Sequence, residues 1–145
     1  MKTLVILAAL SGTLAFRPSV SDFDKVKGPP QGTWRVLEVI DGPASALAAT
    51  MVQISGKRLV LTQGEEKLEL LIVGINPTKG IGTIDLRDKY KRIFRGIYHQ
   101  DGKRLSICVQ FWTEGNAKES IRPQSFLEAD RTKVFGPTMY VLEQK

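Results

Sequence analysis

Cysteine and histidine are nearly absent from the sequence, with one of each in 145 residues. The single cysteine, Cys108, cannot form a disulfide within the chain, so the fold must be stabilised by packing alone. The sequence also has no Gly-x-Ser-x-Gly, no His-Glu-x-x-His and no glycine-rich phosphate loop, so the usual hydrolase and phosphate-binding sites lack their parts. We therefore predict no enzyme activity, no cofactor and no metal. A mechanism based on two carboxylates is left open, and nothing in the sequence favours it.

A hydrophobic run long enough to span a bilayer is also missing. The apolar stretch at residues 4–16, LVILAALSGTLAF, follows Lys2 and ends in small residues, which is typical of an export signal. We predict a signal peptide over residues 1–15, with cleavage after Ala15; an uncleaved anchor is the less favoured alternative. No cysteine follows the leader, so we expect a secreted or periplasmic protein without a lipid or other stable membrane anchor.

Charge of one sign is not concentrated along the chain. The formal net charge is +6, and the 21 basic residues are interspersed with 15 acidic ones. This distribution is typical of a solubilising surface, so we expect no nucleic-acid partner. Residues 16–29 form a polar, proline-containing segment that we predict to be flexible. Residues 30–145 are enough to bury one core, and we predict a monomeric domain there.

Long helical periodicity is absent too, and short β-type segments separated by glycine turns take its place. At most one short helix is expected, at residues 43–50. A Gly64-Glu65 turn predicts one hairpin, in which Leu61 pairs with Leu68 and Leu59 with Leu70, while Val60 and Glu69 lie outside.

A second hairpin is predicted around Asp101-Gly102 as a two-residue type I′ turn. Its register directs one face inward and the other toward solvent. The inward pairs are Tyr98 with Leu105, Gly96 with Ile107 and Phe94 with Val109; the outward pairs are His99 with Arg104, Ile97 with Ser106 and Arg95 with Cys108.

Eight or nine short strands with one apolar face follow from this pattern. Beyond the two hairpins, the strand candidates are residues 33–40, 50–55, 82–87, 121–127 and 138–143. We predict an all-β, antiparallel up-and-down barrel, because closure removes the exposed strand edges. A β-sandwich is the alternative. Eight strands leave interior room for side chains or for one small ligand.

Gly32-Thr33-Trp34, at the head of the first predicted strand, resembles the Gly-x-Trp signature of lipocalins and their calycin relatives, in which the tryptophan closes the barrel floor. The wider sequence over residues 30–145 is similar to a family of small exported, lipocalin-like domains that is expanded in planctomycete bacteria and has no assigned function. The matching segments, in order, are PQGTW (30–34), Asp41-Gly42, NPTK (76–79), Ile-Asp-Leu (84–86), GIY (96–98), Asp101-Gly102, LSIC (105–108) and RPQSF (122–126). The resemblance implies a fold and an exported location. Residues 109–120 depart from the family pattern.

The barrel interior is the first candidate binding site. If the first strand alternates regularly, Glu38 shares the inner face with Trp34 and offers a carboxylate to a polar or cationic ligand group. The favoured alternative is a bulge that turns Leu37 and Val39 inward and Glu38 outward, because a buried unpaired carboxylate is costly. The candidate interior residues are Trp34, Val36, Glu38, Leu59, Leu61, Leu68, Leu70, Phe94, Tyr98, Ile107 and Phe111.

A basic segment, RDKYKRIFR at residues 87–95, is the second candidate. Cations around a tyrosine suit an anionic partner such as an acidic polysaccharide or a lipid headgroup. A solvated strand end that discourages association is the favoured alternative. The residues of this predicted patch are Arg87, Lys89, Tyr90, Lys91 and Arg92.

His99 and Cys108 are predicted on the outer face of their hairpin. His99 would lie beside Arg104, and a surface role is favoured over a catalytic one. Cys108 would lie opposite Arg95, which would favour the thiolate. An inert or dimer-forming thiol is still favoured over a redox role, because no second cysteine can resolve an oxidised one.

Two functions of different classes are therefore expected. The first is an exported, lipocalin-like binding protein that holds a small apolar or amphipathic ligand in the barrel. The second is an interaction module with a filled barrel, inhibitor-like if residues 16–28 take part, whose partner is an envelope protein or an anionic wall polymer. The volume left inside the barrel separates the two.

Overall fold

The computed structural model describes residues 28–40, 49–130 and 135–145. The predicted signal peptide, nearly all of the predicted flexible segment at 16–29 and most of the predicted helix at 43–50 lie outside these ranges. Across the described ranges, no helix is both long and apolar enough to cross a bilayer.

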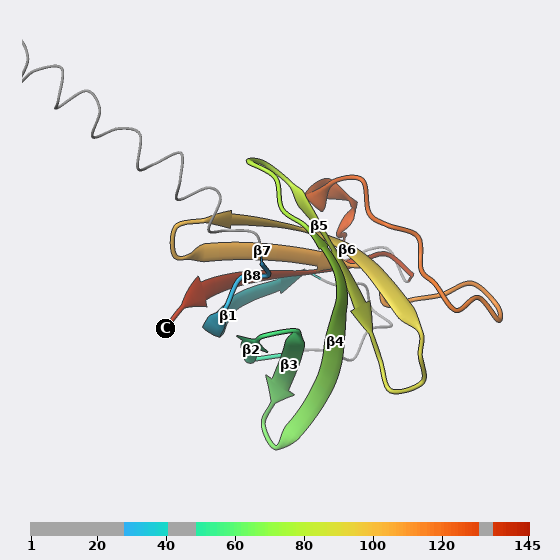
Figure 1. Cartoon of the computed structure of the whole chain (residues 1–145), viewed down its shortest axis with the longest axis horizontal. Helices are drawn as coiled ribbons and strands as arrows, with labels where there is room; N and C mark the ends of the chain where they lie inside the picture. Colours follow the sequence, from blue (N-terminus) through green and yellow to red (C-terminus); the bar gives the residue numbers. More distant parts are fainter. Residues whose placement is uncertain (1–27, 41–48, 131–134) are drawn as a thin grey trace, which may run out of the picture.

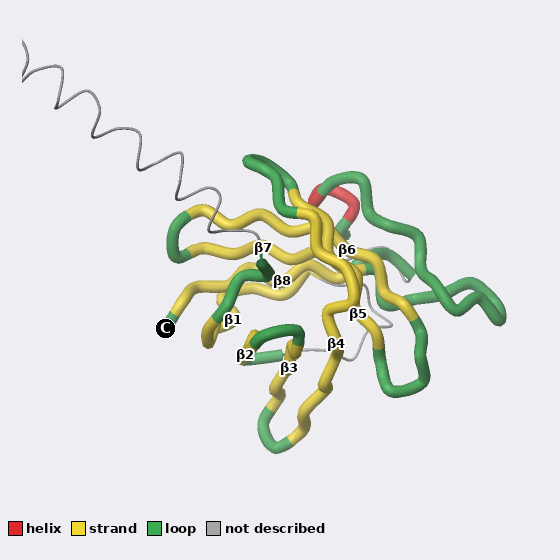
Figure 2. Tube along the Cα trace, in the orientation of Figure 1, coloured by secondary structure: helices red, strands yellow, loops and turns green. Residues whose placement is uncertain are grey.

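Eight antiparallel strands close into an up-and-down barrel, in which β8 returns to pair with β1 (Figure 1). The predicted barrel is confirmed, and the β-sandwich is excluded. Among the described residues, the one helical element is a 3-10 turn, η1 (Phe126–Glu128), drawn in red in Figure 2. The strands are β1 (Gly32–Ile40), β2 (Met51–Ser55), β3 (Arg58–Gln63), β4 (Glu66–Asn76), β5 (Gly82–Arg87), β6 (Ile93–Asp101), β7 (Arg104–Val109) and β8 (Thr138–Gln144).

Glycine at the first central position shapes three two-residue turns. Gly56, Gly64 and Gly102 have φ angles of 61°, 58° and 57°. A positive φ at this position is that of a type II′ turn, whose twist matches the strands that it joins. The β3–β4 hairpin has the predicted register, with Leu61 opposite Leu68.

The β6–β7 hairpin differs from its prediction by two residues. Gly102 takes the first central position of the turn, so Asp101 pairs with Arg104 instead of entering the turn itself. A shift of two residues leaves every side chain on its predicted face. Tyr98 and Leu105 accordingly remain inside the barrel, 6% and 0% exposed.

The predicted strand at 121–127 is wrong. The end of this segment belongs to η1, and the chain between β7 and β8 crosses the outside of the barrel (Figure 1). One of its contacts with the sheet is a parallel bridge between Ile93 and Glu119. The physical reason is that β7 pairs directly with β8, so the closed ring has no place for another strand.

One apolar cluster occupies the barrel interior. Trp34 is 0% exposed, as a residue inside the barrel should be, and its Nε1 has no hydrogen-bond partner among the described residues. Ten of the eleven candidate interior residues belong to the cluster or pack against it: Trp34, Val36, Leu59, Leu61, Leu68, Leu70, Phe94, Tyr98, Ile107 and Phe111.

Glu38 is the exception, and the prediction that it faces the interior is wrong. The register of β1 against β8 shifts between Val36 and Glu38, so a bulge interrupts the alternation. Val39 packs against the core and Glu38 is exposed, as the bulge alternative requires, but Leu37 is 40% exposed rather than buried. The extra residue turns the carboxylate toward water and avoids the cost of desolvating it.

Candidate functional site

The barrel interior has little free space at the level of its large side chains. A gap of about 10 Å³ remains between apolar residues of β2, β3, β5, β7 and β8, including Val52, Leu86 and Tyr140. This is close to the space needed for one water molecule, whereas pockets for small ligands usually have roughly 300–1,000 Å³. Phe94 and Phe111 also face one another here, with ring centroids 5.3 Å apart. The side chains therefore fill this part of the barrel.

A much larger cleft, of about 790 Å³, lies on the side of the barrel between the β3–β4 hairpin and the β5–β6 turn. We call it the cationic groove. Its lining combines the β2–β3 turn, the first half of β4 and the β5–β6 turn. The lining residues are Lys57, Arg58, Lys67, Leu68, Glu69, Leu70, Leu71, Arg87, Asp88, Lys89, Tyr90 and Arg92.

Strand β4 creates the cationic groove because it changes partner halfway along. Residues 66–71 pair with β3, and residues 71–76 pair with β5. The register against β5 shifts between Ile72 and Gly74, which marks a bulge, and a bulge bends its strand. The β3–β4 hairpin therefore diverges from the β5–β6 hairpin, as the long β4 ribbon shows in Figure 1.

Asp88 holds the β5–β6 turn in shape. Its Oδ1 accepts hydrogen bonds from the backbone N–H groups of Tyr90 and Arg92 at 3.0 and 2.9 Å, and its Oδ2 accepts one from Arg92 Nε at 2.8 Å. Burial raises the pKa of Asp88, but the hydrogen bonds and the charge of Arg92 outweigh it, so the pKa lies below its ordinary value. Lys91 has a φ of 66°, in the left-handed region, which lets the chain reverse within the turn.

Basic side chains outnumber carboxylates six to two in the lining of the cationic groove. Each carboxylate is paired within it: Glu69 accepts two hydrogen bonds of 2.7 Å from Arg58, and Asp88 forms an ion pair with Arg92. The hydrogen bonds from Arg58 lower the pKa of Glu69, so it is ionised at neutral pH. Among the described residues, no carboxylate lies at ion-pair distance from the other four cations, which are Lys57, Lys67, Arg87 and Lys89.

Tyr90 gives the cationic groove an exposed aromatic surface. Its side chain is 68% exposed, and Lys89 Nζ and Arg92 Cζ lie 5.0 and 5.6 Å from its ring centroid. Leu71 adds an aliphatic surface and is 38% exposed. Cations held beside exposed apolar groups suit a partner that is both anionic and partly apolar.

The predicted anionic-partner patch lies mostly in this groove. Arg87, Lys89, Tyr90 and Arg92 line it and Lys91 does not, while the binding of an anion there stays a prediction. Sequence reasoning missed three further cations, which are Lys57, Arg58 and Lys67. Each lies in or near a two-residue turn, where an exposed charge is ordinary, and only the barrel topology places them opposite residues 87–92.

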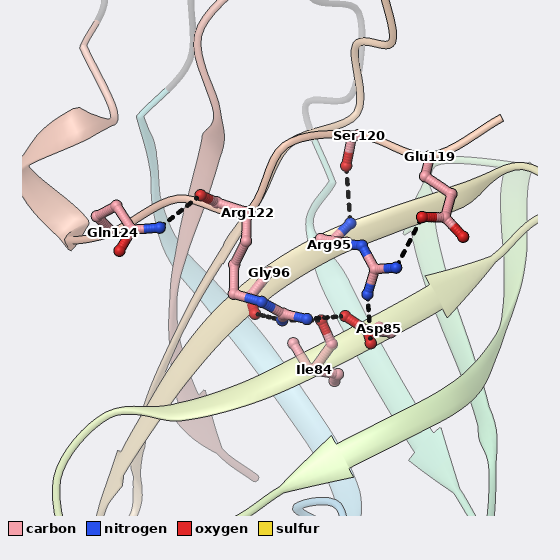
Figure 3. Close-up of polar contacts among 8 residues, drawn as sticks. All are labelled: Ile84, Asp85, Arg95, Gly96, Glu119, Ser120, Arg122 and Gln124. Carbon is pink, nitrogen blue, oxygen red and sulfur yellow. Dashed lines mark hydrogen bonds and ion pairs between the residues drawn. The ribbon is translucent and has the colours of Figure 1, made fainter. Parts of the chain in front are cut away.

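A second basic cluster, which we call the latch, lies on the outer face of β5 and β6 (Figure 3). Arg122 donates to Asp85 Oδ1 and to the carbonyl oxygen of Gly96, both at 2.7 Å. Arg95 donates to Asp85 Oδ2 at 3.1 Å and to Glu119 Oε2 at 2.8 Å. Two cations and two carboxylates therefore balance one another and fasten the chain between β7 and β8 to the barrel.

Cys108 lies on the predicted outer face, but its predicted position opposite Arg95 is wrong, and the fastened chain covers it. Cys108 pairs with Ile97 rather than with Arg95, and the two side chains are 0% and 3% exposed on the outer face of the sheet. Burial, with a smaller contribution from Glu128 of η1, raises the pKa of the thiol to about 12. The thiol therefore stays protonated at neutral pH and is not a nucleophile.

The end of the barrel at the β4–β5 and β6–β7 turns has a pocket of about 630 Å³, and His99 lies near this end. His99 pairs with Ser106 rather than with Arg104, and its Nδ1 lies 2.8 Å from the carbonyl oxygen of Gly80. Tyr98 lines the pocket, and its hydroxyl is buried without a partner among the described residues. In the described part of the chain, no three His, Cys, Asp or Glu side chains are grouped to hold a metal ion.

Comparison with protein-family models, with curated proteins and with solved structures finds no match to this chain. The function must therefore be inferred from the geometry of the sites. The cationic groove and the latch are the two charged clusters on which that inference rests.

Proposed function

We propose that this protein is an exported interaction module that captures an anionic polymer in the cationic groove, with the barrel as a solid support. One observation supports the proposal above the others. Four cations with no carboxylate partner among the described residues line a cleft of about 790 Å³ that also holds an exposed tyrosine. Like charges held close together repel, and an anionic partner would relieve that repulsion.

The packed interior favours this function over a small ligand held in the barrel. At the level of Val52 and Tyr140, the interior gap of about 10 Å³ would admit a ligand only if core side chains moved aside. Protein cores are close-packed, so such a movement costs free energy before any ligand contact is made. The cationic groove needs no comparable rearrangement, because it is already open to solvent.

The net charge of +6 supports the capture of an anion. A basic surface raises the local concentration of acidic partners and speeds their association, and this effect falls as salt screens the charges. An exported location, predicted from residues 1–15, would place the groove among acidic wall polymers and envelope proteins.

Calorimetric titration with two polyanions, poly-L-glutamate and polygalacturonate, tests the proposal at low and at physiological salt. A groove variant carries Lys67→Glu, Arg87→Glu and Lys89→Glu. The matched control carries Lys103→Glu, Lys118→Glu and Lys145→Glu, which are exposed lysines outside the groove lining. The two variants have the same net charge.

We expect the groove variant to bind at least one polyanion about 30-fold more weakly than the wild type, because three charge contacts of about 0.7 kcal/mol each are replaced by repulsion. The control should lose less than about threefold. Equal losses in the two variants would show that net charge alone attracts the polymer. Absence of binding by the wild type to both polyanions would end the proposal.

A further inference from the structure

Part of the backbone edge of β4 has no neighbouring strand among the described residues. β5 ends at Arg87, which pairs with Leu71, so residues 66–70 have β3 on one side and the cationic groove on the other. In Figure 1 this part of β4 runs with β3, away from the β5–β6 turn. The groove therefore exposes the open edge of a sheet, which is a place where another strand can pair.

The alternation of the β3–β4 ladder shows which backbone groups face the groove. The N–H of Ile72 donates to the carbonyl oxygen of Lys57 at 2.6 Å, so the even-numbered residues over 66–72 bond to β3. The odd-numbered Lys67 and Glu69 must direct their N–H and C=O groups to the other side. That side is the groove, and these two residues have no pairing with β5.

The side chains along this edge determine which side chains a paired strand should carry. Leu70 is buried and Leu68 half-buried on the inner face, whereas Lys67 and Glu69 are exposed on the outer face. Glu69 is already neutralised by Arg58, and Lys89 stands on the opposite wall of the groove. A strand laid along β4 would therefore meet leucines with one face and unpaired lysines with the other.

We propose that the partner captured by the cationic groove is an acidic, extended polypeptide segment that pairs with β4 as an added strand. This inference rests on the proposed function and narrows it to one class of polymer. Free N–H and C=O groups recur at every second residue, about 7 Å apart, which is the spacing of another polypeptide backbone. Acidic polysaccharides carry the charge but not this repeat.

The positive charge of the groove favours an acidic polypeptide over a basic one. A second copy of this chain would bring another net charge of +6 against the groove and be repelled. An acidic segment with alternating carboxylate and apolar side chains is attracted on the outer face and buries its apolar side chains against Leu68 and Leu70. About five residues of such a segment would span Lys67–Leu71.

The probe is the peptide acetyl-Glu-Val-Glu-Val-Glu-Val-amide, titrated into the full mature chain by calorimetry. Its control is the depsipeptide in which esters replace the four central amides, which removes N–H donors and keeps every side chain and charge. We expect the depsipeptide to bind about tenfold more weakly, because hydrogen bonds to the β4 edge are lost. Hydrogen exchange should slow at the amides of Lys67 and Glu69 when the parent peptide binds.

A pair of protein variants tests the same backbone hydrogen bonds by changing β4 instead of the peptide. Lys67→Ala removes the charge and keeps the N–H, whereas Lys67→Pro removes both. We expect Lys67→Pro to bind the peptide about tenfold more weakly than Lys67→Ala, and the two variants to bind polygalacturonate equally. If Lys67→Pro does not fold, the depsipeptide comparison and the hydrogen exchange decide whether the peptide pairs with β4.

The outcomes separate this inference from the proposed function. If peptide and depsipeptide bind equally, or if Lys67 and Glu69 gain no protection, the groove captures charge without pairing a strand, and the inference is overturned while the proposed function stands. The same holds if polygalacturonate binds and the peptide does not. If no polyanion and no peptide binds, both are overturned.

Discussion

The latch and the cationic groove lie on the same β5–β6 hairpin and differ in their supply of carboxylates. In the latch, Arg95 and Arg122 share Asp85 and are 31% and 25% exposed. In the groove, Arg87 and Lys89 have no carboxylate at ion-pair distance among the described residues. The comparison teaches that the placement of acidic side chains, rather than the number of basic ones, separates a structural cluster from a surface ready to bind.

Removal of the shared carboxylate should produce the largest difference between the two clusters. Asp85→Ala leaves two partly buried guanidinium groups without their common acceptor, so we expect the free energy of unfolding to fall by about 2 kcal/mol. Urea denaturation followed by circular dichroism measures this loss. The chemical-shift changes that poly-L-glutamate causes at the groove amides of Lys67 and Lys89 should stay the same, because the groove is not touched.

Lys89→Ala is the matched substitution in the groove. It removes an exposed charge that no described carboxylate holds, so the free energy of unfolding should change by less than about 0.5 kcal/mol while polyanion affinity falls. Similar losses of stability for Asp85→Ala and Lys89→Ala would contradict the division into a structural latch and a binding groove.

A loss of stability smaller than that of Asp85→Ala is expected at Asp88, which lines the groove and holds the β5–β6 turn in shape. Its pKa is lowered in the folded protein, so its stabilising contribution is present above the unfolded value of about 4 and is lost as pH falls through the folded value. Asp88→Asn should cost about 1 kcal/mol at pH 7, because the amide oxygen can still accept from the backbone N–H groups, whereas the amide NH2 cannot accept from Arg92 Nε and the charge is lost.

The pH dependence of that difference is the sharper measurement. Urea midpoints of the wild type and Asp88→Asn should converge as pH falls below about 4, because the wild-type carboxylate becomes protonated there. A stability difference that stays constant from pH 7 to pH 2 would mean that the charge of Asp88 does not hold the turn.

Local sequence patterns predicted most of the barrel, and the misses have physical causes. Alternation fixes the face of each side chain, so the core residues of β6 and β7 were right although the turn was displaced to Gly102. The strand predicted at 121–127 failed because Arg122 is held by Asp85, 37 residues away in sequence, and not by a neighbouring strand. Cys108 was placed on the correct face, but nothing local shows that another part of the chain covers it.

The candidate site was predicted only in part for the same reason. The cluster at 87–92 is visible in sequence because its basic residues are adjacent. Lys57 and Lys67 join it only because β4 bends at its bulge and carries the β3–β4 hairpin to the opposite wall of the groove. The carboxylates that pair with Arg95 likewise come from separate segments. The basic run at 87–95 therefore does not show by itself which of its cations are neutralised in the latch and which line the groove.

Chemical-shift mapping of the ¹⁵N-labelled protein, titrated with poly-L-glutamate, tests most directly the claim that the cationic groove is the binding surface. We predict that the amides of Lys67, Glu69, Lys89 and Tyr90 shift together and that the indole N–H of Trp34 and the amide of Arg122 stay in place. Shifts centred on Trp34 would put the ligand inside the barrel, and shifts centred on Arg122 would put it at the latch; either result would contradict the account.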